Sequence, residues 1–180
     1  MIKYDEFVER VNDAGFLTPF TNYIDPEIFT WGRKNSQAYS GNLETDPEQW
    51  KTRSARERKL AYGCFFNGRA GGYISPRFYS IFIDAFNPRI TPEERYESGK
   101  LGKYEKIVWD LLNQHGTPLS WSDFRQKAGL SPANKYKQEI NQLDSALKQL
   151  QVTFDVTICG TTGNMGVIKS IIGFRINGWT

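Results

Sequence analysis

Residues 131–151 have the sequence SPANKYKQEINQLDSALKQLQ, and residues 152–176 continue as VTFDVTICGTTGNMGVIKSIIGFRI. We expect one long helix that leads directly into a β-hairpin. Ser131 is a good N-cap, and Pro132 suits the first helical position, where its missing N–H costs no hydrogen bond. Apolar residues then recur at spacings of four and three, which places them on one helical face: Tyr136, Ile140, Leu143, Leu147 and Leu150.

The opposite face of this predicted helix is polar and uncharged. It carries small and amide side chains: Asn134, Gln138, Asn141, Gln142, Ser145 and Gln149. Lys135, Lys137 and Lys148 lie on its flanks. Amides bond to base edges and phosphates, and ammonium groups bind the phosphate backbone, so this face suits contact with nucleic acid. The same pattern also fits an ordinary solvated helix face.

The residues after the helix alternate in the manner of a β-strand. Four apolar residues fall on one side, namely Val152, Phe154, Val156 and Ile158. Thr153, Asp155 and Thr157 fall on the other side. A glycine-rich loop over 160–166 follows, and residues 167–176 return, which predicts an antiparallel hairpin.

Three shorter elements precede the long helix. Residues 101–115 have the apolar spacing of an amphipathic helix, and residues 117–120 form a brief extended segment. Ser120 and Asp123 then cap a short helix, WSDFRQKA, which Gly129 closes. The order helix, short strand, helix, turn, helix and hairpin is that of a winged helix-turn-helix module.

We assign this module to residues 91–180. A capping box with proline at the first helical position, Thr91-Pro92-Glu93-Glu94, begins a further helix and marks the boundary. The expected fold class is α+β and mainly helical, with the winged module packed on an N-terminal helical part, residues 1–90.

The N-terminal part has its own helical signals. A first helix is predicted over 4–14, with Gly15 at its C-terminal end, and residues 33–53 are predicted to form a long polar surface loop. Ser54 and Glu57 have capping-box spacing, which predicts a helix over 54–67. Tyr73 and Ile74 form a short extended piece. Ser75-Pro76 then opens a helix whose buried side is expected to carry Phe78, Ile81, Phe82 and Ala85.

Composition excludes several classes of protein. The longest apolar runs are far shorter than the roughly 18 residues of a membrane span, so no membrane association is expected. The first residues, MIKYDEFVER, lack the features of a secretory signal. Two distant cysteines provide no disulfide framework, so a reducing, cytoplasmic setting is expected. One histidine and two cysteines are too few for a structural zinc site, and we expect no cofactor.

Charge is unevenly distributed along the chain. Residues 1–100 contain 14 Lys+Arg and 14 Asp+Glu, whereas residues 101–180 contain 9 and 6, so the net charge of +3 lies in the second part. This distribution favours an anionic partner. A separate basic cluster occurs earlier: Lys51, Arg53, Arg56, Arg58 and Lys59. It fits either a phosphate backbone or a solvated face neutralised by nearby acids.

Residues 50–151 resemble the AlkZ-related proteins, winged-helix relatives of the AlkZ/YcaQ-type DNA glycosylases. The resemblance rests on WKTRSARERKLAYGCFFNGRAGGYISPRFYSIFIDAF, LGKYEKIVWDLLNQHGTPLSWSDFRQKAG and LDSALKQLQ. It implies a winged-helix fold associated with DNA. The full glycosylases are similar in having several winged-helix units and a Gln-x-Gln catalytic signature. Here the one such motif, Gln149-Leu150-Gln151, ends the long helix with Leu150 on the apolar face, and we interpret it as a coincidence.

The leading hypothesis is a protein that binds double-stranded DNA through the 131–151 helix and the 160–166 wing, without catalysis of its own. The expected contacts on the long helix are Asn134, Lys135, Lys137, Gln138, Asn141, Gln142 and Lys148. Arg125 on the preceding helix, together with Lys127, is expected to contact phosphate. Asn164 at the wing tip and Lys169 beside it complete the set.

Two alternatives remain open. A winged helix also serves as a protein–protein interaction or scaffold module, and the absence of Arg and Lys between Gly160 and Gly166 favours this hypothesis. Burial of the amide face against residues 1–90 would support it. The third hypothesis is a glycosylase-like DNA-processing enzyme, which needs a cleft and a carboxyl group of shifted pKa at the boundary of the two parts. Glu93, Glu94 and Glu97 lie there, and they also suit the first turn of a helix.

Overall fold

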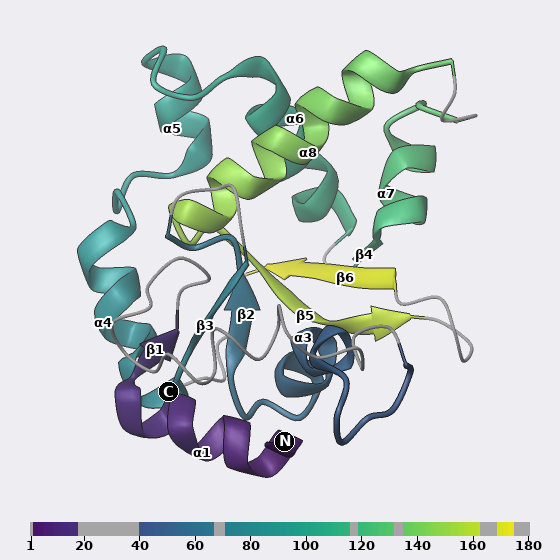
Figure 1. The fold of residues 1–180 in the computed structure, drawn as a ribbon. Helices are drawn as coiled ribbons and strands as arrows, with labels where there is room; N and C mark the ends of the chain where they lie inside the picture. The colour runs from purple at the N-terminus through teal and green to yellow at the C-terminus, as the bar shows by residue number, and fades with distance from the viewer. Residues whose placement is uncertain are drawn as a thin grey trace.

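The computed structural model describes residues 2–17, 40–66, 71–115, 119–131, 135–162 and 169–174, and only the backbone of 159–162 and 169–174. This part of the chain is α+β and mainly helical, with two small antiparallel sheets of three strands each (Figure 1). Figure 1 shows α1 at one end of the molecule and α8 at the other, with the sheets between them. None of the described helices is both long and apolar enough to cross a membrane.

The first helix, α1 (Tyr4–Ala14), forms as predicted. Gly15 follows it with a φ of 87°, a conformation that glycine adopts without a steric penalty, and its N–H donates to the Val11 carbonyl. The buried side of α1 packs on Trp50, whose ring centroid lies 4.7 Å from that of Phe7. This contact brings α1 against α3 (Pro47–Arg56).

The prediction for residues 33–67 is wrong over most of the part that the structure describes. Residues 47–53, expected in a loop, belong to α3, and residues 61–63, expected in a helix, form β2 (Ala61–Gly63). The helix begins earlier because Asp46 is its N-cap and accepts a hydrogen bond from the Glu48 N–H at 2.9 Å. Ser54 therefore lies inside α3 and does not cap a helix, and residues 33–39 lie outside the described residues.

The first sheet has the strand order β1-β3-β2, with β1 at Phe16–Leu17 and β3 at Gly72–Ile74. The extended segment predicted at Tyr73 and Ile74 is thus confirmed. Next, α4 (Pro76–Phe86) begins at its predicted N-cap, Ser75.

The buried side of α4 differs from the prediction. Tyr79 is buried, whereas Ile81 is 57% exposed and Ala85 is also exposed. The reason is an aromatic cluster beneath the helix, which draws in Phe78, Tyr79 and Phe82 and turns Ile81 outward.

The remaining elements follow the predicted order. These are α5 (Pro92–Glu97), α6 (Lys103–His115), β4 (Leu119–Ser120), α7 (Trp121–Lys127), α8 (Lys137–Val152), β5 (Val156–Thr162) and β6 (Lys169–Phe174). Both predicted caps are present, because Thr91 forms a capping box with Glu94, and Ser120 accepts from the Asp123 N–H. The second sheet has the order β4-β6-β5, and both strand pairs are antiparallel.

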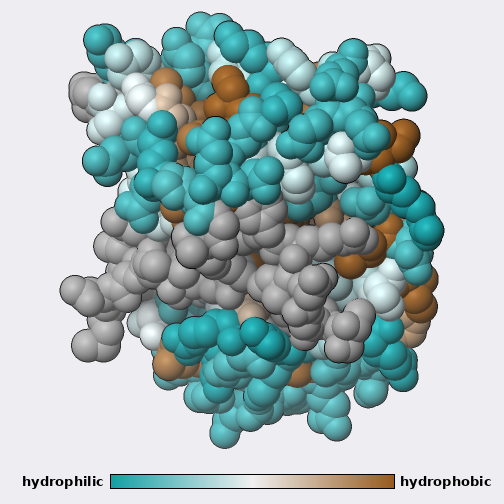
Figure 2. All heavy atoms as spheres, turned by 180° about the vertical axis from the view of Figure 1, so that it is seen from behind, coloured by the Kyte–Doolittle hydropathy of each residue, from teal (hydrophilic) through white to brown (hydrophobic). Residues whose placement is uncertain are grey.

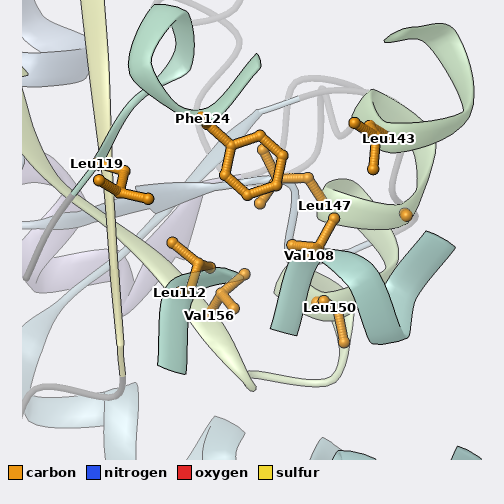
Figure 3. Packing of buried hydrophobic residues seen from close by; sticks show 9 residues of the cluster. Val108, Leu112, Leu119, Phe124, Leu143, Leu147, Leu150 and Val156 are labelled. Carbon is orange, nitrogen blue, oxygen red and sulfur yellow. The ribbon is translucent and has the colours of Figure 1, made fainter. Parts of the chain in front are cut away.

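One hydrophobic core joins the helices α6, α7 and α8 to the second sheet. Side chains from α6, β4, α7, α8 and β5 point into the same space (Figure 3). Phe124 and Leu112 are fully buried there, and Leu143 and Leu150 on α8 are 1% exposed. The apolar face predicted for the long helix is therefore the face that builds this core.

The long helix is shorter than predicted. It begins at Lys137 with Tyr136 as its N-cap, so Ser131 does not cap it, and residues 132–134 lie outside the described residues. Tyr136 and Ile140 are only half-buried. Packing against the core therefore stabilises the first turn less than the turns that carry Leu143 and Leu147.

The strand predicted from Val152 also begins later, at Val156. Val152 is the last residue of α8, and Phe154 has a φ of 54°. The Asp155 N–H donates to the Leu150 carbonyl and the Phe154 N–H to the Gln151 carbonyl, which is the bonding of a helix C-terminus closed by a left-handed residue. Phe154 adopts this conformation although it is not glycine because its ring, 2% exposed, is buried in the N-terminal aromatic cluster.

Candidate nucleic-acid interface

The polar face of α8 is open to solvent. Its described amide and hydroxyl residues are all exposed, namely Gln138, Asn141, Gln142, Ser145 and Gln149. The opposite face holds the buried residues Leu143 and Leu147. The described residues of the 1–90 part therefore do not bury the described amide side chains, a burial that would have favoured the scaffold hypothesis.

Cationic side chains surround the connection between α7 and α8. Lys127, Lys135 and Lys137 are exposed, and Arg125 is half-buried. Within the described part of the chain, none of the four has a carboxylate at ion-pair distance. Figure 1 shows the end of α7 close to the start of α8. The N-terminus of α8 carries the positive end of its helix dipole, so charge and dipole act together here.

Four of the other predicted cations are neutralised by carboxylates. Lys148 forms an ion pair with Asp144, with 2.5 Å between Nζ and Oδ2. In the earlier basic cluster, three of the five cations are paired: Lys51 with Glu48, Arg53 with Glu44 and Glu57, and Lys59 with Asp5. The cluster is thus largely a solvated, self-neutralised face. The spacings Glu48–Lys51 and Asp144–Lys148 are a local signal that could have indicated these pairs from the sequence.

Two predicted contacts, Asn134 and Asn164, lie outside the described residues, as do residues 163–166 of the predicted 160–166 wing. Lys169 begins β6, where its backbone lies opposite Thr162. The predicted contact Lys169 therefore lies at the end of the β5–β6 pair.

The two glutamines of Gln149-Leu150-Gln151 do not share one environment. Gln149 is exposed, whereas Gln151 is 3% exposed. The Gln151 Oε1 accepts from the Cys64 N–H at 2.9 Å, and its Nε2 donates to the Leu147 carbonyl at 3.5 Å. The motif thus splits between a solvent-facing amide and a buried structural amide.

A cavity of about 190 Å³ lies at the boundary that the third hypothesis requires, and its walls include Asn87, Ile90, Trp109, Phe154 and Asp155. The acids around it serve structural roles. Glu93 accepts from the Trp109 Nε1 at 2.5 Å, and Asp155 is paired with Arg95. Hydrogen bonds from the Thr91 backbone and hydroxyl lower the pKa of Glu94, which is the opposite of the shift that a general acid needs.

The described residues contain no group of three or more His, Cys, Asp and Glu side chains placed to hold a metal ion.

The capping role of Glu94 predicts a measurable pKa change. In Thr91→Ala the hydroxyl donor is lost while the backbone donor remains, so we expect the pKa of Glu94 to rise toward its ordinary value. An NMR titration of the side-chain carboxyl measures this, with Thr91→Ser as the variant that retains the hydroxyl. An unchanged Glu94 titration in Thr91→Ala would show that the hydroxyl plays no part in the shift.

Comparison with known protein families identifies a match. The family model described as AlkZ related matches residues 1–166, which extends well beyond the segment 50–151 that carries the resemblance in the sequence. No curated protein and no solved structure matches the chain. The match includes α1, the whole first sheet, α8 and β5, and it ends before β6. The chain therefore belongs to the AlkZ-related family.

Proposed function

We propose that residues 91–180 form a winged helix-turn-helix module packed on residues 1–90, and that the module binds double-stranded DNA. The order α6-β4-α7-α8-β5-β6 supports this assignment, as does the sheet order β4-β6-β5, in which the short strand joins the hairpin. In such a module the third helix, here α8, enters the major groove and the hairpin loop touches the neighbouring backbone. Membership of the AlkZ-related family supports a role connected with DNA.

The observation that carries the proposal is the exposed amide face of α8 next to cations that have no carboxylate at ion-pair distance among the described residues. Gln138, Asn141 and Gln142 offer donors and acceptors to base edges. Lys135 and Lys137 hold phosphates near the start of the helix, and Arg125 with Lys127 holds phosphates from α7. Lys148 contributes less than the other lysines because Asp144 neutralises it. The module acts by binding and has no catalysis of its own.

Salt dependence tests this proposal directly. If the four cations at the α7–α8 connection each bind one phosphate, log K should fall with log salt with a slope of about −3.6. Duplex binding should then weaken roughly a hundredfold between 50 and 200 mM salt. Fluorescence anisotropy with a labelled duplex of mixed sequence measures both quantities. Absence of binding at 50 mM salt, or a slope near zero, would contradict DNA binding by this module.

A protein partner is the second candidate, and a specific observation favours it. Charges on α3 form a patchwork of ion pairs, and large apolar side chains are exposed along and after α4: Ile81 at 57%, Phe86 at 55% and Ile90 at 42%. In the rear view of Figure 2, hydrophobic residues are visible among mainly hydrophilic ones. Apolar surface of this kind marks protein contacts more often than DNA contacts. Two variants separate the functions. If α8 binds DNA and the apolar surface binds a protein, duplex binding should be lost in Lys135→Glu with Lys137→Glu and kept in Phe86→Ser.

A further inference from the structure

The corner between α8 and β5 contacts both the N-terminal part and α5. It comprises residues 151–155, which the sequence pattern assigned to the end of a helix and the start of a strand. Four of its five residues each contact a segment that lies far away in the sequence. These contacts differ in chemistry: they comprise hydrogen bonds, a ring stack and an ion pair.

Gln151 binds the end of β2. Its Oε1 accepts the Cys64 N–H at 2.9 Å, and the side chain is almost fully buried. Gly63 leaves the space for this amide, because a Cβ at position 63 would lie 2.8 Å from the Gln151 Oε1 and 2.8 Å from the Phe65 ring. The amide thus packs closely against β2 at a position that only glycine leaves open.

Phe154 binds the aromatic cluster under α4. Its ring stacks on Phe65 with centroids 5.0 Å apart and an interplanar angle of 8°, and it meets Tyr79 edge-on at 5.6 Å. The left-handed backbone of Phe154 is unfavourable for a residue with a side chain, so burial of this ring holds the corner in a conformation that it would not adopt alone.

Two polar contacts complete the corner. The Asn87 Nδ2 donates to the Thr153 carbonyl at 2.9 Å. The Arg95 Nη2 donates to the Asp155 Oδ2 at 2.5 Å, and both side chains are about 5% exposed. The Thr153 hydroxyl donates to the same Asp155 oxygen. Residues on both sides of the turn are therefore held, one at the end of α8 and one at the start of β5.

We infer that residues 151–155 are a positioning joint, through which the N-terminal part sets the direction of α8 relative to the rest of the molecule. This inference rests on the proposed function, because the direction of α8 decides whether its amide face meets the groove while the hairpin meets the backbone. Gln151 is the positioning residue of the joint. It touches no nucleic acid and acts by holding the end of α8 on β2. The residues that contact DNA, on the face of α8, are thus distinct from residues 151–155, which set the direction of that helix.

The first experiment measures the direction of α8 without DNA. Spin labels are placed on the exposed residues Ser145 and Leu43 in the full chain, with Cys64 and Cys159 replaced by serine. Gln151→Met keeps the length of the side chain but removes the acceptor for the Cys64 N–H. We expect the distance distribution between the labels to broaden or shift in Gln151→Met. Gln114→Met, the same change at an exposed position on α6, should leave the distribution as in the parent protein.

The second experiment measures duplex binding of the unlabelled variants at a temperature where circular dichroism shows them folded. We expect Gln151→Met to bind roughly tenfold more weakly, with the salt slope unchanged because the phosphate-binding cations are all present. A loss of stability alone would not weaken duplex binding by the folded protein while leaving the salt slope unchanged. If Gln151→Met does not fold, Asn87→Ala, which removes the half-buried donor to the Thr153 carbonyl, replaces it in both experiments.

The outcomes separate the joint from the proposed function. A distance distribution and an affinity that both equal those of the Gln114→Met control would overturn the joint, whatever the parent protein binds. A parent protein that binds no duplex would overturn the proposed function and with it the role of the joint in DNA binding. The label distances would then still show whether Gln151 sets the direction of α8.

Discussion

Replacing Lys135 and Lys137 together by glutamate is expected to remove most duplex binding, roughly a hundredfold in affinity at low salt. Both lysines are exposed at the start of α8 and have no carboxylate partner among the described residues. Two phosphate contacts are lost and two repulsive charges are added. The slope of log K against log salt should become shallower by about 1.8, since each phosphate contact contributes about 0.9. Anisotropy titrations at several salt concentrations measure both effects.

A matched control separates this local effect from total charge. Lys3→Glu with Arg77→Glu makes the same change in net charge on exposed residues at the starts of α1 and α4. Figure 1 places α1 at the opposite end of the molecule from α8. We expect this pair to weaken binding only slightly. Equal losses in the two double variants would mean that binding follows net charge, and full binding by Lys135→Glu with Lys137→Glu would contradict the assignment of α8.

Asp155→Ala is expected to destabilise the full chain by about 3–5 kcal/mol at neutral pH. It removes the counter-ion of Arg95, which is 5% exposed and whose Nε already finds no acceptor among the described residues. A buried guanidinium without its carboxylate bears an uncompensated desolvation cost. The double variant with Arg95→Leu should recover part of the loss because no buried charge remains. Urea denaturation followed by circular dichroism measures the free energy of unfolding of each variant.

Asp144→Ala is the surface counterpart of this experiment. It breaks an ion pair of the same 2.5 Å length, with Lys148, but the carboxylate is 45% exposed. We expect a cost below about 1 kcal/mol. If Asp155→Ala costs no more than Asp144→Ala, the Arg95–Asp155 pair does not hold the corner of α8 and β5 as its burial suggests.

The elements predicted correctly from the sequence are those with strong local signals. Gly15 ends α1, the capping box of Thr91 and Glu94 begins α5, and Ser120 caps α7 as predicted. The apolar spacing of four and three also identified the face of α8 that builds the core. Such signals act within one or two helical turns, so neighbouring residues contain all the information that they require.

The wrong predictions arose where two local signals competed for one helix start, or where residues distant in the sequence determined the conformation. Asp46-Pro47 and Ser54 both resemble helix starts, and burial of Trp50 favoured the first. Phe154 looked like a strand residue because its alternation fits, yet its ring belongs to a cluster built from β2, β3 and α4. The pairing of some cations likewise depends on residues far away in the sequence, since Lys59 pairs with Asp5, 54 residues away.

For the candidate interface, the sequence by itself determined the composition of the α8 face and the family to which the chain belongs. The tertiary structure decided that this face is exposed and that Gln151 is turned inward onto β2. The physical reason is that helical periodicity orders side chains around one axis using neighbouring residues alone. Exposure depends on which other segments pack against that axis, and those segments lie outside α8: α6 packs on its apolar face, and the end of β2 binds Gln151.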